Sequence, residues 1–170
     1  MELLVKKAKK GDSEAFIMLI EKNKEALKRV AFAYLKNEED VADAIQDTIL
    51  SAYEHIESLK KAEYFRTWII RILINNCTKI YRRNRKHVNC ESNPEEYGES
   101  VMEACYAEAA HADLEFYDLL RALPEESRLI FQLYFGEQFT TAEIAKLLHM
   151  NENTVKSKIH RGKELLKGQI

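Results

Sequence analysis

Apolar residues recur every three to four positions along most of the chain, a spacing that places them on one face of an α-helix. The first run covers 12–35 and begins with Asp12 and Ser13, either of which can cap a helix N-terminus. A second run covers 41–56 and a third covers 64–85. No alternating pattern typical of a β-strand competes with these runs, so the pattern predicts an all-α fold.

Shorter helices are predicted in the last third of the chain. One covers 113–122, and the next has Pro124 at its first position and ends near Gly136. Two short helices finish the chain. The segment 88–111 contains a proline, a glycine and many acids, so we interpret it as a linker with a short helix near 100–108.

Composition agrees with a small helical protein. The 170 residues suit one domain or two small ones, and the apolar share of 46% excludes a wholly disordered chain. The chain has only five glycines and two prolines, which argues against a sandwich or barrel with many turns. We therefore predict two small helical domains, 1–88 and 113–170, joined by an acidic flexible linker at 89–112.

Charge is distributed in blocks, although the net charge is only −2. Residues 37–59 carry seven acids and no Lys or Arg, whereas 66–87 carry seven Lys or Arg and no acid. Nine acids follow in 88–120, and the chain is basic again after residue 152. Basic blocks are candidate phosphate-binding surfaces, and acidic blocks can bind a basic protein. Any single block could also be a solvated helix face.

The last two helices have the pattern of a helix-turn-helix. Thr140 and Glu143 form a predicted capping box, and a short turn at His149 leads to Asn151 as the next cap. A helix of this size fits the DNA major groove, whereas a plain helical hairpin would not need a basic, acid-poor outer face. The residues predicted on that outer face are Asn153, Lys156, Ser157, His160 and Arg161.

The third long run mixes aromatic residues with cations, first in 64–71 and again in 81–86. Aromatic rings stack on unpaired bases, a contact worth ~1–3 kcal/mol each, while Arg and Lys hold the backbone. The mixture therefore favours a surface that engages opened DNA. The alternatives are that Trp68 packs in the core and that Arg82, Arg83 and Arg85 form a solvated helix end.

Metal, membrane and secretion signals are weak. Three cysteines cannot all pair within one chain, and no CxxC is present, so we expect a reduced, cytoplasmic protein. A zinc set could be assembled from His87, Cys90, Cys105 and His111, but the His87–Cys90 spacing is a weak signal. No long apolar run is present. We expect no metal, no cofactor and no direct membrane insertion.

Four segments, in this order, resemble the extracytoplasmic-function (ECF) sigma factors of the primary-sigma superfamily. Residues 40–48 are similar to the helix that binds the polymerase clamp, and 65–75 match the segment that melts and reads the minus-ten element. Residues 123–128 resemble the start of the C-terminal domain, and 153–161 resemble the minus-thirty-five recognition helix. The resemblance implies that 1–88 is sigma domain 2 and 113–170 is sigma domain 4.

The resemblance also assigns roles to residues of this chain. Those implied to face core RNA polymerase are Asp40, Asp43, Gln46, Asp47 and Tyr53. Those implied to contact minus-ten DNA are Arg66, Trp68, Arg71, Asn75, Lys79, Arg82 and Arg83. Those implied to contact minus-thirty-five DNA are Asn153, Lys156, Ser157, Lys158, His160 and Arg161. Asn75 aligns with the position that meets a flipped base, and Lys158 is directed toward phosphate.

A sigma factor directs core polymerase to promoters and is not an enzyme. The resemblance implies three partners: core RNA polymerase, promoter DNA and an anti-sigma factor, often anchored in the membrane. It also implies an envelope-stress response. Two positions depart from the family pattern: His149 stands where a glycine usually turns the chain, and His160 replaces another large side chain.

Three other classes of protein compete with this interpretation. A helix-turn-helix repressor or activator, with 1–110 sensing a ligand or dimerising, leaves the acidic helix and the basic-aromatic helix unexplained. An anti-sigma or other polymerase-binding protein without a DNA role is disfavoured by the two basic faces. An enzyme is disfavoured because the sequence shows no glycine-rich phosphate loop, metal-ligand cluster or positioned nucleophile.

Overall fold

The computed structural model describes residues 1–35, 37–88, 116 and 118–168. These residues form helices and turns, with no strand among them, which confirms the all-α fold. They divide into two units. The first holds Met1–Ala31 and the chain from Glu39 to the end of α4 (Phe65–Val88), and the second holds Phe32–Glu38 and the described residues from 116 onward. Within the described ranges, no helix combines the length and the apolar character needed to cross a membrane.

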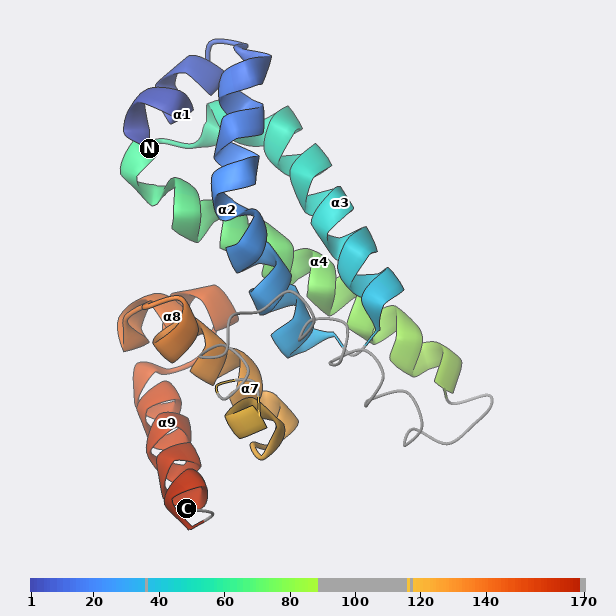
Figure 1. The fold of residues 1–170 in the computed structure, drawn as a ribbon, viewed down its shortest axis with the longest axis vertical. Helices are drawn as coiled ribbons and strands as arrows, with labels where there is room; N and C mark the ends of the chain where they lie inside the picture. The colour runs from blue at the N-terminus through green and yellow to red at the C-terminus, as the bar shows by residue number, and fades with distance from the viewer. Residues whose placement is uncertain (36, 89–115, 117, 169–170) are drawn as a thin grey trace. The chain divides into compact units, whose positions relative to one another are not determined.

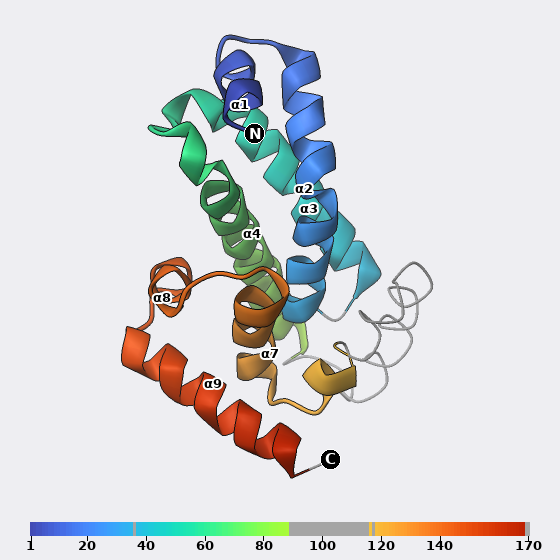
Figure 2. The same cartoon turned by 60° about the vertical axis from the view of Figure 1, so that its left-hand side comes forward.

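Three long helices make up most of the first unit. They are α2 (Ser13–Tyr34), α3 (Glu38–His55) and α4, which run side by side in Figures 1 and 2. The short α1 (Glu2–Ala8) precedes them, and two single turns, η1 (Ile56–Ser58) and η2 (Ala62–Tyr64), connect α3 to α4. The largest fully buried side chains of this unit are Leu19, Leu27, Phe65, Ile69, Ile70 and Leu73.

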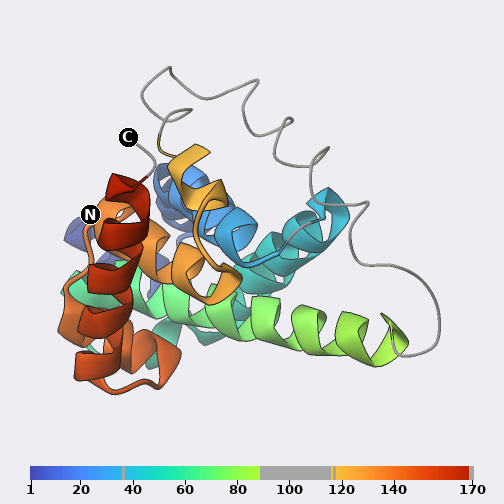
Figure 3. The ribbon, with the colours of Figure 1, turned by 90° about the horizontal axis from the view of Figure 1, so that it is seen from below.

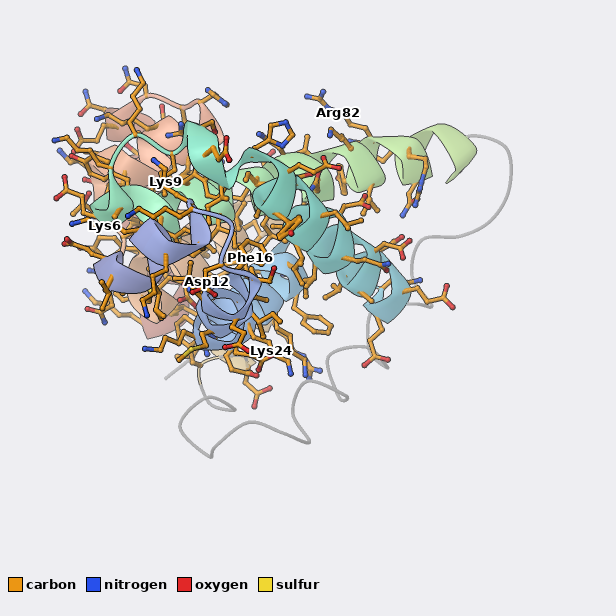
Figure 4. The ribbon with its side chains drawn as sticks, turned by 90° about the horizontal axis from the view of Figure 1, so that it is seen from above. Lys6, Lys9, Asp12, Phe16, Lys24 and Arg82 are labelled. Atoms are coloured by element: carbon orange, nitrogen blue, oxygen red, sulfur yellow. The ribbon has the colours of Figure 1, made fainter. Side chains whose placement is uncertain are left out.

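Local contacts fix the amino-terminal end of this unit. Asp12 caps α2, because its Oδ1 accepts a hydrogen bond from the Ala15 amide at 3.0 Å. Gly11 has a φ of 88°, a left-handed conformation that reverses the chain between α1 and α2. Lys9 Nζ donates to the Leu59 carbonyl at 2.5 Å, which ties the end of α1 to the turn before α4. Figure 4 shows Lys9 between α1 and this turn, and Asp12 at the start of α2.

The second unit contains α7 (Glu125–Phe131), a π-helical turn η3 (Gln132–Gly136), α8 (Thr141–Leu148) and α9 (Glu152–Lys167). Residues 118–121 are also helical, which agrees with the helix predicted over 113–122 as far as that range is described. The largest fully buried side chains here are Leu123, Ile130, Leu133, Ile144, Leu147 and Gln132.

The prediction for Pro124 is wrong by one position. Pro124 is the N-cap of α7, with an extended ψ of 143°, and the helix begins at Glu125. Proline suits both positions because it has no N–H to lose, so sequence alone does not separate them. The helical segment does end at Gly136, as predicted, through a Glu137 amide that donates to the Gln132 carbonyl at 2.9 Å. The predicted linker at 89–112 lies outside the described residues, and so does the short helix predicted near 100–108.

Candidate nucleic-acid and protein interfaces

Helix α3 has one buried face and one acidic face. Its buried residues are Val41, Ala44, Thr48 and Ala52, at the three-to-four spacing of a helix packed on one side. The exposed side therefore carries four of the five residues that the resemblance assigns to core polymerase: Asp43, Gln46, Asp47 and Tyr53.

Two large side chains on this face are unusually exposed. Tyr53 is 56% exposed, although its ring packs edge-on against Phe16, with 5.2 Å between the ring centroids. Leu50 is also 56% exposed and was not predicted as part of the site. An apolar residue within an acidic helix face was the available signal. Together they give α3 a surface that a protein partner can bury.

Asp40 differs from the other four residues of the predicted polymerase set. Its side chain is only 17% exposed, and its Oδ2 accepts a hydrogen bond from Asn84 Nδ2 of α4 at 2.7 Å. Its Oδ1 lies 3.8 Å from Arg83 Nη2, also on α4. The structure thus joins one residue of the predicted polymerase set to one of the predicted DNA set.

Helix α4 is long and unbroken (Figure 3), and one of its faces is strongly basic. Its buried side includes Phe65, Ile69, Leu73 and Cys77. The opposite side exposes Arg71, Asn75, Lys79 and Arg82 of the predicted minus-ten set, and Arg66 and Arg83 of that set are exposed elsewhere on the helix. In Figure 4, Arg82 extends from the side of α4 that faces away from α3. Trp68 is half-buried, and its ring centroid lies 5.9 Å from that of the buried Phe65, so it combines a packing contact with partial exposure.

Tyr64 begins the aromatic and cationic segment 64–71 and was not in the predicted minus-ten set. It is 53% exposed at the end of η2, and the Lys61 ammonium lies 5.6 Å from its ring centroid. The structure adds Tyr64 to the exposed aromatic and cationic side chains at the start of α4.

A series of side-chain hydrogen bonds crosses the interface between α3 and α4. Asn76 is 6% exposed and donates from Nδ2 to Thr48 Oγ1 at 3.2 Å, while Thr48 donates to the Ala44 carbonyl at 2.6 Å. Lys79 Nζ donates to Asn76 Oδ1 at 3.4 Å. These hydrogen bonds satisfy the buried Asn76 side-chain amide, and they orient Lys79, one of the predicted DNA-contacting cations.

The helix-turn-helix prediction is confirmed in its local details. The Glu143 amide donates to Thr140 Oγ1 at 3.2 Å, and the Thr140 amide donates to Glu143 Oε2 at 2.9 Å, which completes the capping box. His149 has a φ of 53°, the left-handed conformation expected at the turn. Asn151 caps α9 by accepting from the Asn153 amide at 2.8 Å.

Helix α9 presents the predicted outer face to solvent. Val155, Ile159 and Gly162 are buried, so the opposite positions are exposed. They are Asn153, Lys156, Ser157, His160 and Arg161. These five positions lie within the first three turns of α9.

Two lysines of α9 are engaged by carboxylates. Lys158 is 24% exposed, and its ammonium lies 2.6 Å from Glu126 Oε2 of α7, which lowers the pKa of Glu126. Lys156 lies 2.9 Å from Glu152 Oε1, one turn earlier on α9. Hydrogen bonds from Lys156 and Thr141 lower the pKa of Glu152. Lys158 therefore points toward α7, whereas Lys156 stays on the outer face.

The described residues contain no group of three or more His, Cys, Asp or Glu side chains placed to hold a metal ion. The side chains considered for zinc, from His87 to His111, are outside the described set. Cys77 is a buried free thiol, and burial raises its pKa to about 12. It therefore belongs to the core of the first unit.

Comparison with known proteins agrees with this arrangement. The family described as "Sigma-70 region 2" matches residues 19–87, and "Sigma-70, region 4" matches 113–166. The chain is 28% identical over 184 residues to the ECF RNA polymerase sigma factor SigW of Bacillus subtilis, covering 100% of this chain and 98% of the relative. It is 27% identical over 164 residues to RNA polymerase sigma factor SigV of the same organism, covering 96% of each.

A solved structure shares the fold. It is the sigma factor RpoE in complex with the anti-sigma factor NepR from Bartonella quintana, which is 20% identical with a TM-score of 0.66 and covers 90% of this chain and 94% of that one. The two regional matches fall on the unit that carries the acidic and basic helices and on the unit that carries the helix-turn-helix. The chain therefore belongs to the sigma-70 family, as an extracytoplasmic-function RNA polymerase sigma factor.

Proposed function

We propose that this chain is a dissociable promoter-specificity subunit of bacterial RNA polymerase that works through three exposed helix faces. The acidic face of α3 docks on the core enzyme, the basic face of α4 opens the minus-ten element, and the outer face of α9 reads the minus-thirty-five element. In this proposal 1–88 and 113–170 are the functional domains, and 89–112 is the tether.

Membership of the sigma factors makes the chain a transcription initiation factor that directs core polymerase to promoters, and not an enzyme. The observation that best supports separate roles for α3 and α4 is the separation of charge between these two helices. Acids occupy the exposed face of α3, whereas the exposed face of α4 carries cations and no acid. An acidic face avoids nucleic acid and suits a protein partner, while a basic face suits phosphate.

Separating the strands of the minus-ten element breaks base stacking, which costs a few kcal/mol per base. Contacts between the protein and the opened strand must offset this cost. The start of α4 has the exposed Tyr64 and the partly exposed Trp68 close in sequence to the exposed Arg66 and Arg71. Stacking of an unpaired base on an aromatic ring recovers ~1–3 kcal/mol, and the arginines hold the backbone. We assign Asn75, exposed one turn beyond Arg71, to the edge of a flipped base.

The upstream element is read as duplex DNA. Arg161 and Lys156 lie on the exposed face of α9 and can donate to base edges in the major groove. Arg161→Ala should weaken discrimination at one base pair by ~1–3 kcal/mol. Binding affinities of the holoenzyme for promoters with single substitutions in the upstream element measure this effect. Unchanged promoter selectivity would remove Arg161 from the set of reading residues.

Control by an anti-sigma factor completes the proposal. A related solved sigma factor is held by such a partner. In this chain, exposed Leu50 and Tyr53 among the acids of α3 give an inhibitor the same surface that core polymerase needs. We extend the proposal to an anti-sigma factor anchored in the membrane and to an envelope-stress response, and we place the chain in the cytoplasm, where polymerase and promoters are.

Reconstitution tests the proposed function. The purified chain is added to core polymerase and a genomic DNA template, and the 5′ ends of the transcripts are sequenced. We expect start sites that share two upstream elements and that are absent with core polymerase alone. A chain that binds DNA by itself and initiates no transcript would instead be an ordinary helix-turn-helix regulator, and the proposal would fail.

A further inference from the structure

In the last turns of α4 whose side chains the structure describes, 81–85, no side chain is fully buried. Ile80 is buried, but Arg82, Arg83 and Arg85 are exposed, and Asn84 is half-buried. Apolar packing holds a helix in place, so these last turns need another contact to keep a fixed direction. The cations of this segment are the ones that the proposed function directs to DNA.

Asp40 supplies such a contact from the first turns of α3. Its Oδ2 accepts from Asn84 Nδ2 at 2.7 Å, and its Oδ1 lies 3.8 Å from Arg83 Nη2. The two α4 residues are adjacent in sequence, and they are more than forty positions from Asp40, so the contact joins two separate helices. A carboxylate in the first turn of a helix also interacts favourably with the helix dipole.

Asp40 is poorly placed to bind another protein. Its side chain is 17% exposed, whereas Asp43 and Asp47 on the same helix are exposed. A polymerase side chain that reached Asp40 would compete with Asn84 and Arg83 for the same carboxylate. Truncating Asp40 would leave the Asn84 amide without this acceptor and would remove a charge facing Arg83.

We propose that Asp40 is a positioning residue, which acts through Asn84 and Arg83 to hold the DNA-contacting end of α4, and is not a contact to core polymerase. This inference deepens the proposed function and rests on it. A specific polar contact then joins the polymerase-docking helix α3 to the strand-opening helix α4. Because of this contact, the orientation of α3 on core polymerase also sets the direction of the α4 cations.

The first experiment uses the full chain alone and does not depend on the proposed function. Hydrogen exchange of the amides in 82–85 is compared between the wild type, Asp40→Ala and Glu38→Gln, which removes an exposed acid from the same end of α3. We expect Asp40→Ala to speed exchange about three- to tenfold, the scale of a partly exposed hydrogen-bonded ion pair, and Glu38→Gln to leave it unchanged. Equal exchange in all three proteins would overturn the positioning role.

The second experiment uses the holoenzyme and separates positioning from docking. Core affinity and permanganate reactivity of the opened strand are measured for Asp40→Ala and Asp43→Asn. We expect Asp40→Ala to keep core affinity within about twofold and to lower the opened fraction about three- to tenfold, whereas Asp43→Asn weakens core binding. The exchange variant Asp40→Asn with Asn84→Asp should restore opening, because it keeps the amide-to-carboxylate hydrogen bond between α3 and α4.

Two outcomes would overturn the inference. One is a loss of core affinity by Asp40→Ala equal to that of Asp43→Asn, with no selective loss of opening. The other is an exchange variant that opens no better than Asp40→Ala. A wild-type chain that fails to initiate transcription would refute the proposed function instead, and the hydrogen-exchange result would still decide whether Asp40 holds the end of α4.

Discussion

At Gly162, α9 packs closely against Phe131 of α7 and Leu123. A Cβ built on this glycine would lie 2.4 Å from two ring carbons of Phe131 and 3.2 Å from Leu123 Cδ2. Phe131 and Leu123 are each 2% exposed, so neither can move aside into solvent. The absence of a side chain at Gly162 therefore sets how α9, and with it the recognition face, is seated on α7.

The cost of Gly162→Ala follows from two opposing effects. Overpacking a filled core costs ~1–3 kcal/mol, and the rigid ring contact at Gly162 favours the upper part of that range. Replacing a helix-interior glycine by alanine returns ~1 kcal/mol of helix propensity. We therefore expect Gly162→Ala to lower the free energy of unfolding by about 1–2 kcal/mol.

The assay is urea unfolding of the full chain, together with hydrogen exchange of peptides from α7 and α9. Gly168→Ala is the matched control, because its Cβ would meet its nearest atom, the Leu165 carbonyl oxygen, at an ordinary 3.6 Å. Faster exchange in α7 and α9 should accompany Gly162→Ala only. If Gly162→Ala proves as stable as Gly168→Ala, the close packing of α9 on α7 is not a constraint and the reasoning fails.

Three further predictions concern other contacts. Thr140→Ala should destabilise α8 by ~0.5–2 kcal/mol through loss of the capping box, as measured by thermal unfolding; an unchanged midpoint would show that the cap contributes nothing. The pKa of Glu126 lies below its ordinary 4.5 because of Lys158, so its stabilising contribution is present above pH 4.5 and is lost as pH falls through the lowered pKa. An NMR titration in Lys158→Gln should return that pKa to its ordinary value, and an unaltered titration would contradict the pairing. Cys77, buried and with its pKa raised to about 12, should resist alkylation at neutral pH until urea unfolds the chain; rapid labelling of the native protein would contradict its burial.

The helices and their caps were predictable because the information is local. The Thr140 and Glu143 capping box, the left-handed His149 and the Asn151 cap each depend on residues a few positions apart. Pro124 was misplaced by one position because a proline is tolerated at the N-cap and at the first helical position alike.

The direction of individual charged side chains was not predictable. The charge blocks gave the sign of each surface, but Asp40 meets Asn84 of α4 and Lys158 meets Glu126 of α7 across long stretches of sequence. Such contacts depend on how helices pack, which helical periodicity does not specify. Leu50 was missed for a related reason: apolar character predicts burial on average, and only the packed structure shows which large side chains stay exposed.

Direct binding to core RNA polymerase, measured with the purified chain and no inhibitor present, tests the central claim that α3 docks this protein on the enzyme. We predict a stable one-to-one complex that charge reversal at Asp43 and Asp47 weakens and that charge reversal at the exposed α2 residues Lys22 and Lys24 leaves intact. No detectable complex, or one that is insensitive to the α3 reversals, would contradict the account.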